Sequence, residues 1–164
     1  MSFALACAER LQPRREFSGD SSAVALVRSM LDTVFDVIGG NSAKLVELHP
    51  LAAALEAAPY LDDDAAAATA YAVRCLLSGD AQNALRAAQR GYDARDRQAQ
   101  EQNRDYENAP DYEERLLAHP AGQQELAMQI ADLDALAKSA DAAAMVVLRA
   151  RKIVQRGLAG GAIG

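Results

Sequence analysis

The chain has 164 residues, of which 51% are apolar and 24% charged, and its net charge is −6. It contains 37 Ala and 19 Leu but only nine Val and two Thr, so good helix formers are abundant and residues that favour strands are scarce. This composition excludes a sheet protein and a disordered chain, and no apolar stretch approaches the roughly 20 residues of a membrane span. We predict an all-α protein in which residues 1–164 form a single compact bundle of six or seven helices.

Two helices are predicted at the start of the chain. The first covers Ser2 to Leu11 as a short amphipathic segment that ends ahead of Pro13, because proline disfavours helical geometry at the residue before it. In the second, large apolar residues recur at spacings of three and four between Val24 and Ile38, until Gly39-Gly40 ends the helix. We expect this second segment to be a core helix.

Two further helices are predicted in the next part of the chain. Asn41-Ser42 can cap a leucine-bearing helix that reaches Pro59, although Pro50 is expected to break or restart it near His49. The following helix is an alanine-rich run preceded by Asp62-Asp63-Asp64. We interpret these carboxylates as caps that complement the helix dipole, and a site for a metal or a basic partner is the alternative.

Three more helices are predicted toward the C-terminus. One runs from Asn83 to Asn103, and a connection at residues 110–119 contains one or two helical turns. Pro120 suits the first position of the next helix. The last helix ends at Arg156-Gly157, and we expect a flexible tail from about residue 158.

Large apolar side chains are unevenly distributed among these segments. They concentrate in the helix of residues 24–38 and in the last two helices, whereas alanine crowds the middle helices and implies close packing there. We therefore expect the helix of residues 24–38 and the last two helices to build the core. The apolar stripe of the helix that follows Pro120 consists of Leu126, Ile130, Leu133, Leu136 and Ala137.

Motifs of the common enzyme classes are missing from the sequence. It has no glycine-rich phosphate loop after a strand, no dinucleotide fingerprint and no nucleophile elbow. Neither His49 nor His119 has an acid three residues before it, as di-iron bundles require, and two His with two Cys give no zinc spacing. We therefore expect no metal and no cofactor, and a non-catalytic protein rather than an enzyme.

Cys7 and Cys75 lie far apart in the sequence, each within an apolar stretch. We interpret them as buried free thiols rather than as a disulfide or a reactive pair. The N-terminal segment lacks the basic start of a secretory signal, and Glu9 and Arg10 interrupt its apolar run. These features predict a cytoplasmic protein that does not contact a membrane.

Acidic residues and tyrosines gather in one segment. Between Asp93 and Arg115 there are eight acids and four arginines. The segment is either a solvated face with weak ion pairs or a surface for a protein partner, because Tyr and Arg are enriched at interface cores. The residues that we assign to such a surface are Tyr92, Asp105, Tyr106, Glu107, Asp111, Tyr112, Glu113 and Glu114.

Basic residues gather in and just before the last helix. A nucleic-acid surface is one interpretation of this cluster, but the chain as a whole is acidic and few aromatic residues accompany the basic ones. We favour a structural role near a helix end and expect no binding to nucleic acid. The residues concerned are Lys138, Arg149, Arg151, Lys152 and Arg156, against a single Asp141.

The opening of the chain resembles a known family. Phe3-Ala4-Leu5-Ala6-Cys7-Ala8-Glu9-Arg10, followed by Pro13 and Phe17, is similar to the start of the YjaG-like family of bacterial proteins, a domain of unknown function. The leucine-rich segment up to Pro59 and the glycine-rich end agree in outline, whereas Phe35 stands where the family has tryptophan. The resemblance implies an all-helical fold and supplies no catalytic residues.

Three functional hypotheses follow. The first is a non-catalytic, acidic protein-binding module, such as an immunity protein that neutralises a cationic bacterial toxin. The second is a small-molecule binder or enzyme whose pocket between helices gathers Glu9 and Arg10, with Tyr71 or His49; the alternative role of Glu9 and Arg10 is a structural ion pair. The third is a self-associating regulatory protein, a homodimer with small-residue faces buried between copies.

Overall fold

The computed structural model describes residues 1–11, 21–57, 63–139 and 142–160, and these ranges contain helices and no strands. The predicted all-α fold is confirmed, with eight α-helices in the described ranges rather than six or seven, because the connection after residue 110 forms a short helix of its own. No described helix is long and apolar enough to cross a membrane. The helices are α1 (Ser2–Leu11), α2 (Ser21–Ile38), α3 (Leu45–Ala57), α4 (Asp64–Ser78), α5 (Ala81–Gln102), α6 (Tyr112–Leu117), α7 (Pro120–Lys138) and α8 (Ala142–Gly160).

Several helix ends form as the sequence predicts. The side chain of Asp63 caps α4 by accepting a hydrogen bond from the backbone N–H of Ala66 at 2.9 Å. Gly79 ends the same helix at a φ of 71°, a left-handed conformation that glycine adopts without steric cost. Pro120 occupies the first turn of α7. The helix α8 reaches Gly160, beyond the predicted start of the tail, and residues 161–164 lie outside the described ranges.

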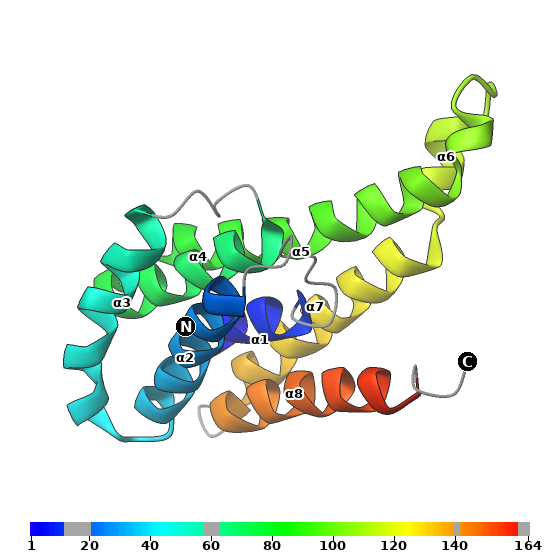
Figure 1. Cartoon of the computed structure of the whole chain (residues 1–164). Coiled ribbons are helices and arrows are strands. Elements are labelled where there is room, and N and C mark those ends of the chain that lie inside the picture. The colour runs from blue at the N-terminus through cyan, green and yellow to red at the C-terminus, as the bar shows by residue number, and fades with distance from the viewer. Residues whose placement is uncertain (12–20, 58–62, 140–141, 161–164) are drawn as a thin grey trace.

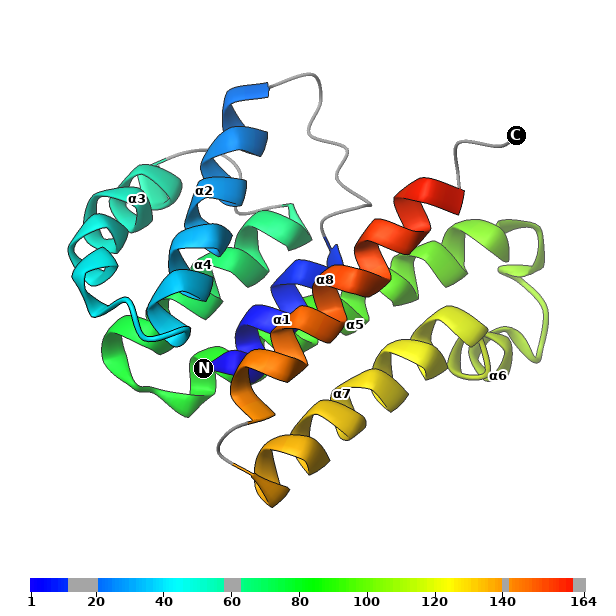
Figure 2. The same cartoon turned by 90° about the horizontal axis from the view of Figure 1, so that it is seen from below.

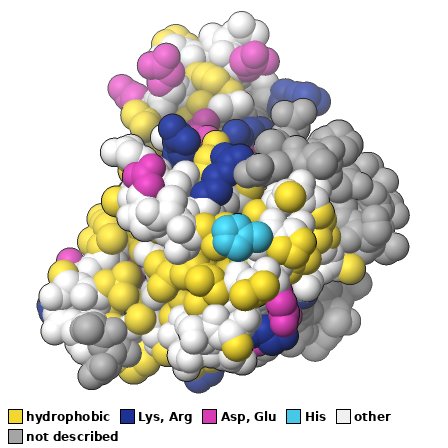
Figure 3. Space-filling model, turned by 90° about the vertical axis from the view of Figure 1, so that its left-hand side faces the viewer, with side chains coloured by type: hydrophobic (Ala, Val, Ile, Leu, Met, Phe, Trp, Pro, Cys, Tyr) yellow, Lys and Arg dark blue, Asp and Glu magenta, His cyan; other side chains and the backbone are white. Residues whose placement is uncertain are grey.

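Helix α3 lies on the outside of the bundle (Figure 1), on a side that exposes many apolar side chains (Figure 3). The predicted break at Pro50 is wrong, because α3 continues through this proline. Proline cannot donate to the carbonyl of Val46 one turn earlier, but Val46 is 77% exposed, so water can satisfy that carbonyl. Asn41 makes no side-chain cap and precedes a 3-10 turn, η2 (Ser42–Lys44).

The N-terminal helix α1 runs through the middle of the bundle. It packs against α8, α4, α5, α2 and α7 (Figure 2). Every residue of α1 except Phe3 is buried, so the amphipathic prediction for this segment is wrong. The helix is short, and five neighbouring helices cover it on all sides. Its two charged residues, Glu9 and Arg10, are therefore inside the protein.

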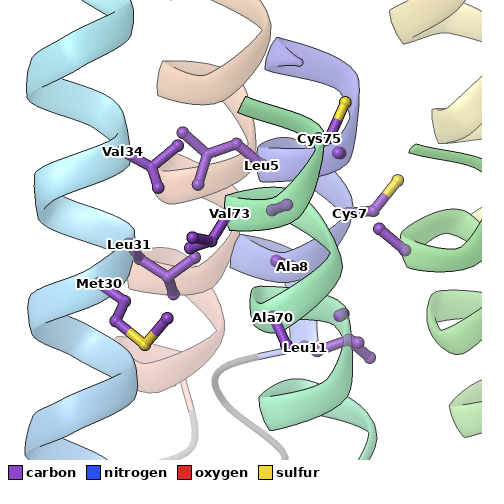
Figure 4. Packing of buried hydrophobic residues seen from close by; sticks show 14 of the residues in the cluster. Leu5, Cys7, Ala8, Leu11, Met30, Leu31, Val34, Ala70, Val73 and Cys75 are labelled. Carbon is purple, nitrogen blue, oxygen red and sulfur yellow. The ribbon is translucent and has the colours of Figure 1, made fainter. Parts of the chain in front are cut away.

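The main core lies between α1, α2 and α4 (Figure 4). Leu5 of α1 lies beside Val34 of α2, and Val73 of α4 is close by; all three are fully buried. The predicted close packing of the alanine-rich region is confirmed in α4, whose small side chains let the neighbouring helices approach. The buried alanines of α4 are Ala65, Ala66, Ala67, Ala68, Ala70 and Ala72.

Helix α7 has the reverse of the predicted orientation. Leu126, Ile130 and Leu133 were expected in the core, yet they are 37%, 60% and 49% exposed. Ala137 is also exposed, and Leu136 is half-buried against a small cluster that includes part of α8. The face of α7 that points inward carries Gly122, Glu125, Gln129 and Asp132. Polar groups inside the bundle, described below, account for this reversal.

Helices α5 and α7 run together beyond the other helices and meet at α6 (Figures 1 and 2). Between them the chain also forms a 3-10 turn, η3 (Arg104–Tyr106). We call residues 100–119 the tip. It contains the end of α5, η3 and α6, and it projects from the body of the bundle.

Candidate functional site

The tip is acidic and lacks a core of its own. None of residues 100–121 is buried. Residues 100–119 contain six acids and two arginines, which gives −4 of the chain's total of −6 when His119 is neutral. The exposed acids are Glu101, Asp105, Glu107, Glu113 and Glu114. Most of the protein's net negative charge thus lies on this projection.

An aromatic side chain stands at the centre of this charge. Tyr106 is 49% exposed, and the guanidinium of Arg115 lies 4.7 Å from the centroid of its ring. Nε of Arg115 also donates to Oδ2 of Asp111 at 2.7 Å, one turn earlier in the chain. These contacts hold the α6 segment against η3 and fix the position of Tyr106.

A notch of about 260 Å³ separates the end of α5 from η3 and α6. Glu101 and Glu107 contribute carboxylates to it, and Tyr112 contributes a ring. Arg97, which also lines the notch, pairs with the carboxylate of Asp64 on α4. The other lining residues are Gln100 and Arg104. The notch therefore places two carboxylates and an aromatic ring beside two guanidiniums, of which that of Arg97 already has an acidic partner.

The structure brings seven of the eight residues predicted for a partner surface onto the tip. Tyr92 is the exception: it is half-buried in the middle of α5, far from the tip in sequence. Its Cε2 lies 3.7 Å from where a Cβ on Gly122 of α7 would be. Tyr92 therefore packs between α5 and α7. The seven on the tip are Asp105, Tyr106, Glu107, Asp111, Tyr112, Glu113 and Glu114.

A second group of charged residues is buried inside the bundle around Arg10. Nη1 of Arg10 donates to Oδ2 of Asp132 at 2.6 Å, and Nη2 donates to Oε1 of Glu125 at 2.9 Å. All three side chains are at most 3% exposed. Burial alone would lower the pKa of Arg10, but Cys7, Glu125 and Asp132 outweigh it, and the pKa is raised. The guanidinium is therefore charged, and it pins α1 to α7.

The carboxylates of α7 have further partners. Nε2 of Gln129 donates to Oε1 of Glu125 at 3.0 Å, and Arg149 of α8 pairs with Asp132. A Cβ on Gly91 of α5 would lie only 3.2 Å from Oε1 of Glu125, so the absence of a side chain there makes room for the carboxylate. This arrangement explains why the polar face of α7 points inward.

Glu9 is the centre of another group of charged side chains, on the other side of α1 from the group around Arg10. Its Oε1 accepts from Nε of Arg151 on α8 at 2.6 Å, and its Oε2 from Nη1 of Arg28 on α2 at 3.5 Å. Arg151 also binds Asp32 of α2 at 2.9 Å. Burial raises the pKa of Glu9, and the two arginines offset this only in part. Glu9 and Arg10 are thus both buried, but each pairs with other helices rather than with its neighbour.

Two arginines of the last helix, α8, form ion pairs with acids inside the bundle. Arg149 and Arg151 lie in the middle of α8 and pair with the buried acids Asp132 and Glu9, so their role is structural but differs from the predicted one near a helix end. The side chain of Arg156, and Asp141, lie outside the described residues. Two residues of the basic cluster, Arg149 and Arg151, therefore form ion pairs with acids of the interior.

The two cysteines are free and buried, as predicted. Nη2 of Arg10 donates to Sγ of Cys7 at 3.4 Å. Burial nevertheless raises the pKa of Cys7 to about 12, so the group is a thiol at neutral pH and a poor nucleophile. Cys7, Glu9 and Arg10, which carry the resemblance to the YjaG-like family, are all parts of the packed interior.

No protein-family model, curated protein or solved structure matches this chain. The resemblance of its opening to the YjaG-like family stays a prediction. Within the described residues, no group of three or more His, Cys, Asp or Glu side chains is placed to hold a metal ion.

A second hollow lies between α3 and α4, on the side shown in Figure 3. It has a volume of about 480 Å³, and its lining combines His49, Arg74 and Asp80 with polar Ser78 and Asn83 and apolar Ala52, Ala53 and Leu77. Tyr71 lies near it, with the guanidiniums of Arg74 and Arg86 5.9 and 5.7 Å from its ring centroid. The lining of this hollow includes neither Glu9 nor Arg10. The structure does not bring those two residues together with His49.

Sequence reasoning missed the residues of α7 that face Arg10. Gly122, Glu125, Gln129 and Asp132 recur at spacings of three and four, which places them on one face of a helix. The same helix carries an apolar stripe, and that stripe was taken as the buried face. The available signal was Arg10 within the apolar run of the first helix, because a buried arginine requires acids as partners.

The raised pKa of Glu9 predicts a pH dependence of stability. A carboxyl group whose pKa is higher in the folded protein binds its proton more tightly there, so its contribution is fully present below its unfolded pKa of about 4.5. That contribution is lost as the pH rises through the folded value. Glu9→Gln cannot titrate, so its free energy of unfolding should rise relative to wild type as the pH increases from 4 upward. Urea unfolding of both proteins across this range measures the difference, and a flat or falling difference contradicts the prediction.

Proposed function

We propose that the protein is a non-catalytic protein-binding module and that its tip binds a basic protein. One observation carries this proposal: a net charge of −4 lies on a projection in which no residue is buried. Like charges held close together repel one another, and the tip has no core to offset that repulsion. A partner of opposite charge would relieve it.

The chemistry of the tip favours lysine and arginine side chains. Carboxylates of Glu101 and Glu107 in the notch can accept charge-assisted hydrogen bonds from a cation, and Tyr112 beside them offers a ring. Exposed Tyr106 adds an aromatic contact of the kind that dominates many interfaces. Long-range attraction to the acidic tip would also speed the encounter with a basic partner.

A basic toxin domain is the biological partner that we propose. Nucleases, for example, have positively charged substrate clefts, and an acidic projection that enters such a cleft would block it. Membership of the YjaG-like family is part of the same proposal. The buried positions of Cys7, Glu9 and Arg10 support it, because proteins that share a fold often keep the residues that hold its interior together.

The test compares two variants with the same change in net charge. Asp105→Lys/Glu107→Lys alters the tip, and Asp36→Lys/Glu47→Lys alters exposed acids of α2 and α3. The immobilised full chain is used to capture proteins from cells of the source organism, and each captured protein is identified by mass spectrometry. We expect a basic protein that binds wild type and the control variant, is lost from the tip variant by at least tenfold, and dissociates as the salt concentration rises.

The captured protein is then expressed alone and together with the chain. Toxicity alone and rescue by wild type, but not by the tip variant, would support neutralisation of a toxin. A partner that binds the tip variant as well as wild type, or that is itself acidic, contradicts the proposal. A gene for a secreted toxin immediately upstream would be independent support.

The hollow between α3 and α4 favours a second candidate, a small-molecule binder. Its volume of about 480 Å³ is within the usual range for ligand pockets, and the end of the hollow that carries His49 and Arg74 could hold an anionic group, whereas Asp80 would repel that group from its own side. Ligand-detected NMR with small carboxylates should then give saturation transfer that is lost in Arg74→Ala. Equal signals from both proteins would reject this candidate.

A further inference from the structure

The exposed face of α7 is apolar along its length. Leu126, Ile130 and Leu133 follow one another at spacings of four and three, so they form a continuous stripe on one side of the helix. Ile130, at the centre, is 60% exposed. Ala137 extends the stripe by one more turn and is also exposed.

The outward orientation of this face follows from the opposite face of α7. The opposite face of α7 is fixed inward because Glu125 and Asp132 are paired with Arg10. Breaking those buried pairs to bring the leucines inside would leave charges unpaired in the interior. The apolar stripe therefore cannot be buried by rotating α7, and only another surface that packs on it from outside can cover it.

The spacing of the stripe is complementary to itself. If two copies of α7 cross antiparallel with Ile130 on the two-fold axis, Leu126 of one copy faces Leu133 of the other, because they lie four and three residues on either side of it. A two-fold interface needs only one such patch, used twice. The alanines beside the stripe, Ala127 and Ala131, are exposed and small enough to let the two helices approach.

The exposed polar residues fit the same arrangement. Gln123 near the start of α7 then lies level with Lys138 of the other copy, so a neutral amide meets the ammonium and no like charges are opposed there. The exposed acids of α6, Glu113 and Glu114, flank the start of α7, whereas Lys138 stands at its end. Antiparallel pairing brings these opposite charges to the same end of the interface.

We propose that the exposed stripe of α7 is a dimer interface, occupied by α7 of a second copy of this chain in antiparallel orientation. The buried small-residue faces expected for self-association are not involved, because the alanines of α4 already lie inside one chain. Helix α7 is 19 residues long, or roughly 28 Å, which allows contact over five turns. The two tips project from opposite ends of the dimer; Glu113 and Glu114 lie beside Lys138 of the other copy, whereas the part of the partner surface around Asp105 and Glu107 lies outside the interface.

Light scattering coupled to gel filtration, over a range of protein concentrations, tests the proposal. We expect wild type to have about twice the chain mass of 17.4 kDa at the higher concentrations. Ile130→Glu places two carboxylates together on the two-fold axis and should weaken the dimer by at least a hundredfold, with an unchanged helical circular dichroism spectrum. Leu85→Glu, which alters a leucine of α5 that is 59% exposed, should leave the mass unchanged.

A crosslink reports the register and does not depend on a disruptive change. Ile130→Cys should form a disulfide between copies under mild oxidation, since both cysteines meet at the axis, and Leu85→Cys should not. Cys7 and Cys75 are buried and do not compete. A monomer at every concentration, a dimer that Ile130→Glu leaves intact, or equal crosslinking at both positions overturns the proposal. The tip variant Asp105→Lys/Glu107→Lys should still dimerise, which separates this result from the test of partner binding.

Discussion

Replacing Arg10 with methionine is expected to lower the free energy of unfolding by about 3–5 kcal/mol. The methionine fits the space of the arginine stem but leaves Glu125 without its strongest partner and Asp132 with Arg149 alone. Both carboxylates are at most 1% exposed, so water cannot replace the lost guanidinium. Chemical denaturation with urea at neutral pH measures the change.

The matched control is Arg115→Met on the tip. Arg115 also pairs with a carboxylate, that of Asp111, but both side chains are more than 40% exposed. Exposed pairs of this kind contribute at most about 1 kcal/mol. The comparison that matters is between the losses in the free energy of unfolding that Arg10→Met and Arg115→Met cause. Similar small losses for both would mean that the buried group around Arg10 is not a structural centre.

Truncating Leu5 to alanine is expected to lower the free energy of unfolding by about 3–5 kcal/mol. Leu5 is fully buried in α1 beside Val34 and Val73, and a close-packed interior relaxes only partly, so the truncation leaves a cavity. Thermal unfolding should show a clear drop in the midpoint temperature.

Leu85→Ala provides the comparison for this loss. Leu85 is 59% exposed on α5, so its truncation removes little buried surface and should change stability by less than about 0.5 kcal/mol. If Leu5→Ala were as mild as Leu85→Ala, the centre of the bundle would not be at α1.

The parts of the fold that depend on neighbours in the sequence could be predicted. Helix α2 follows from its apolar spacing, and the caps at Asp63 and Gly79 follow from local hydrogen bonding and backbone conformation. The acidic tip could be predicted for the same reason: its charges are close in the chain and stay exposed on folding. None of these required knowledge of which helix packs against which.

The inward face of α7 could not be predicted in this way. Glu125 and Asp132 are buried because Arg10, more than a hundred residues earlier, is buried opposite them. Leu126 and Ile130 are assigned to the core by the rule that the apolar face of a helix is buried, and this rule assumes that the polar face meets water. That rule fails where the polar face of one helix meets a charged residue of a central helix. The half-buried position of Tyr92 likewise depends on Gly122 in another helix.

The central position of α1 has a consequence for how the protein is made. Helix α1 is synthesised before the helices that surround it, and Arg10 and Glu9 each pair with side chains 115 to 142 residues further along. Their charges must stay hydrated until α7 and α8 have been synthesised, so a nascent chain that ends before α8 cannot complete the interior. The interior around α1 should therefore form only after α8 has been synthesised, and its folding should be slow for a helical protein of this size.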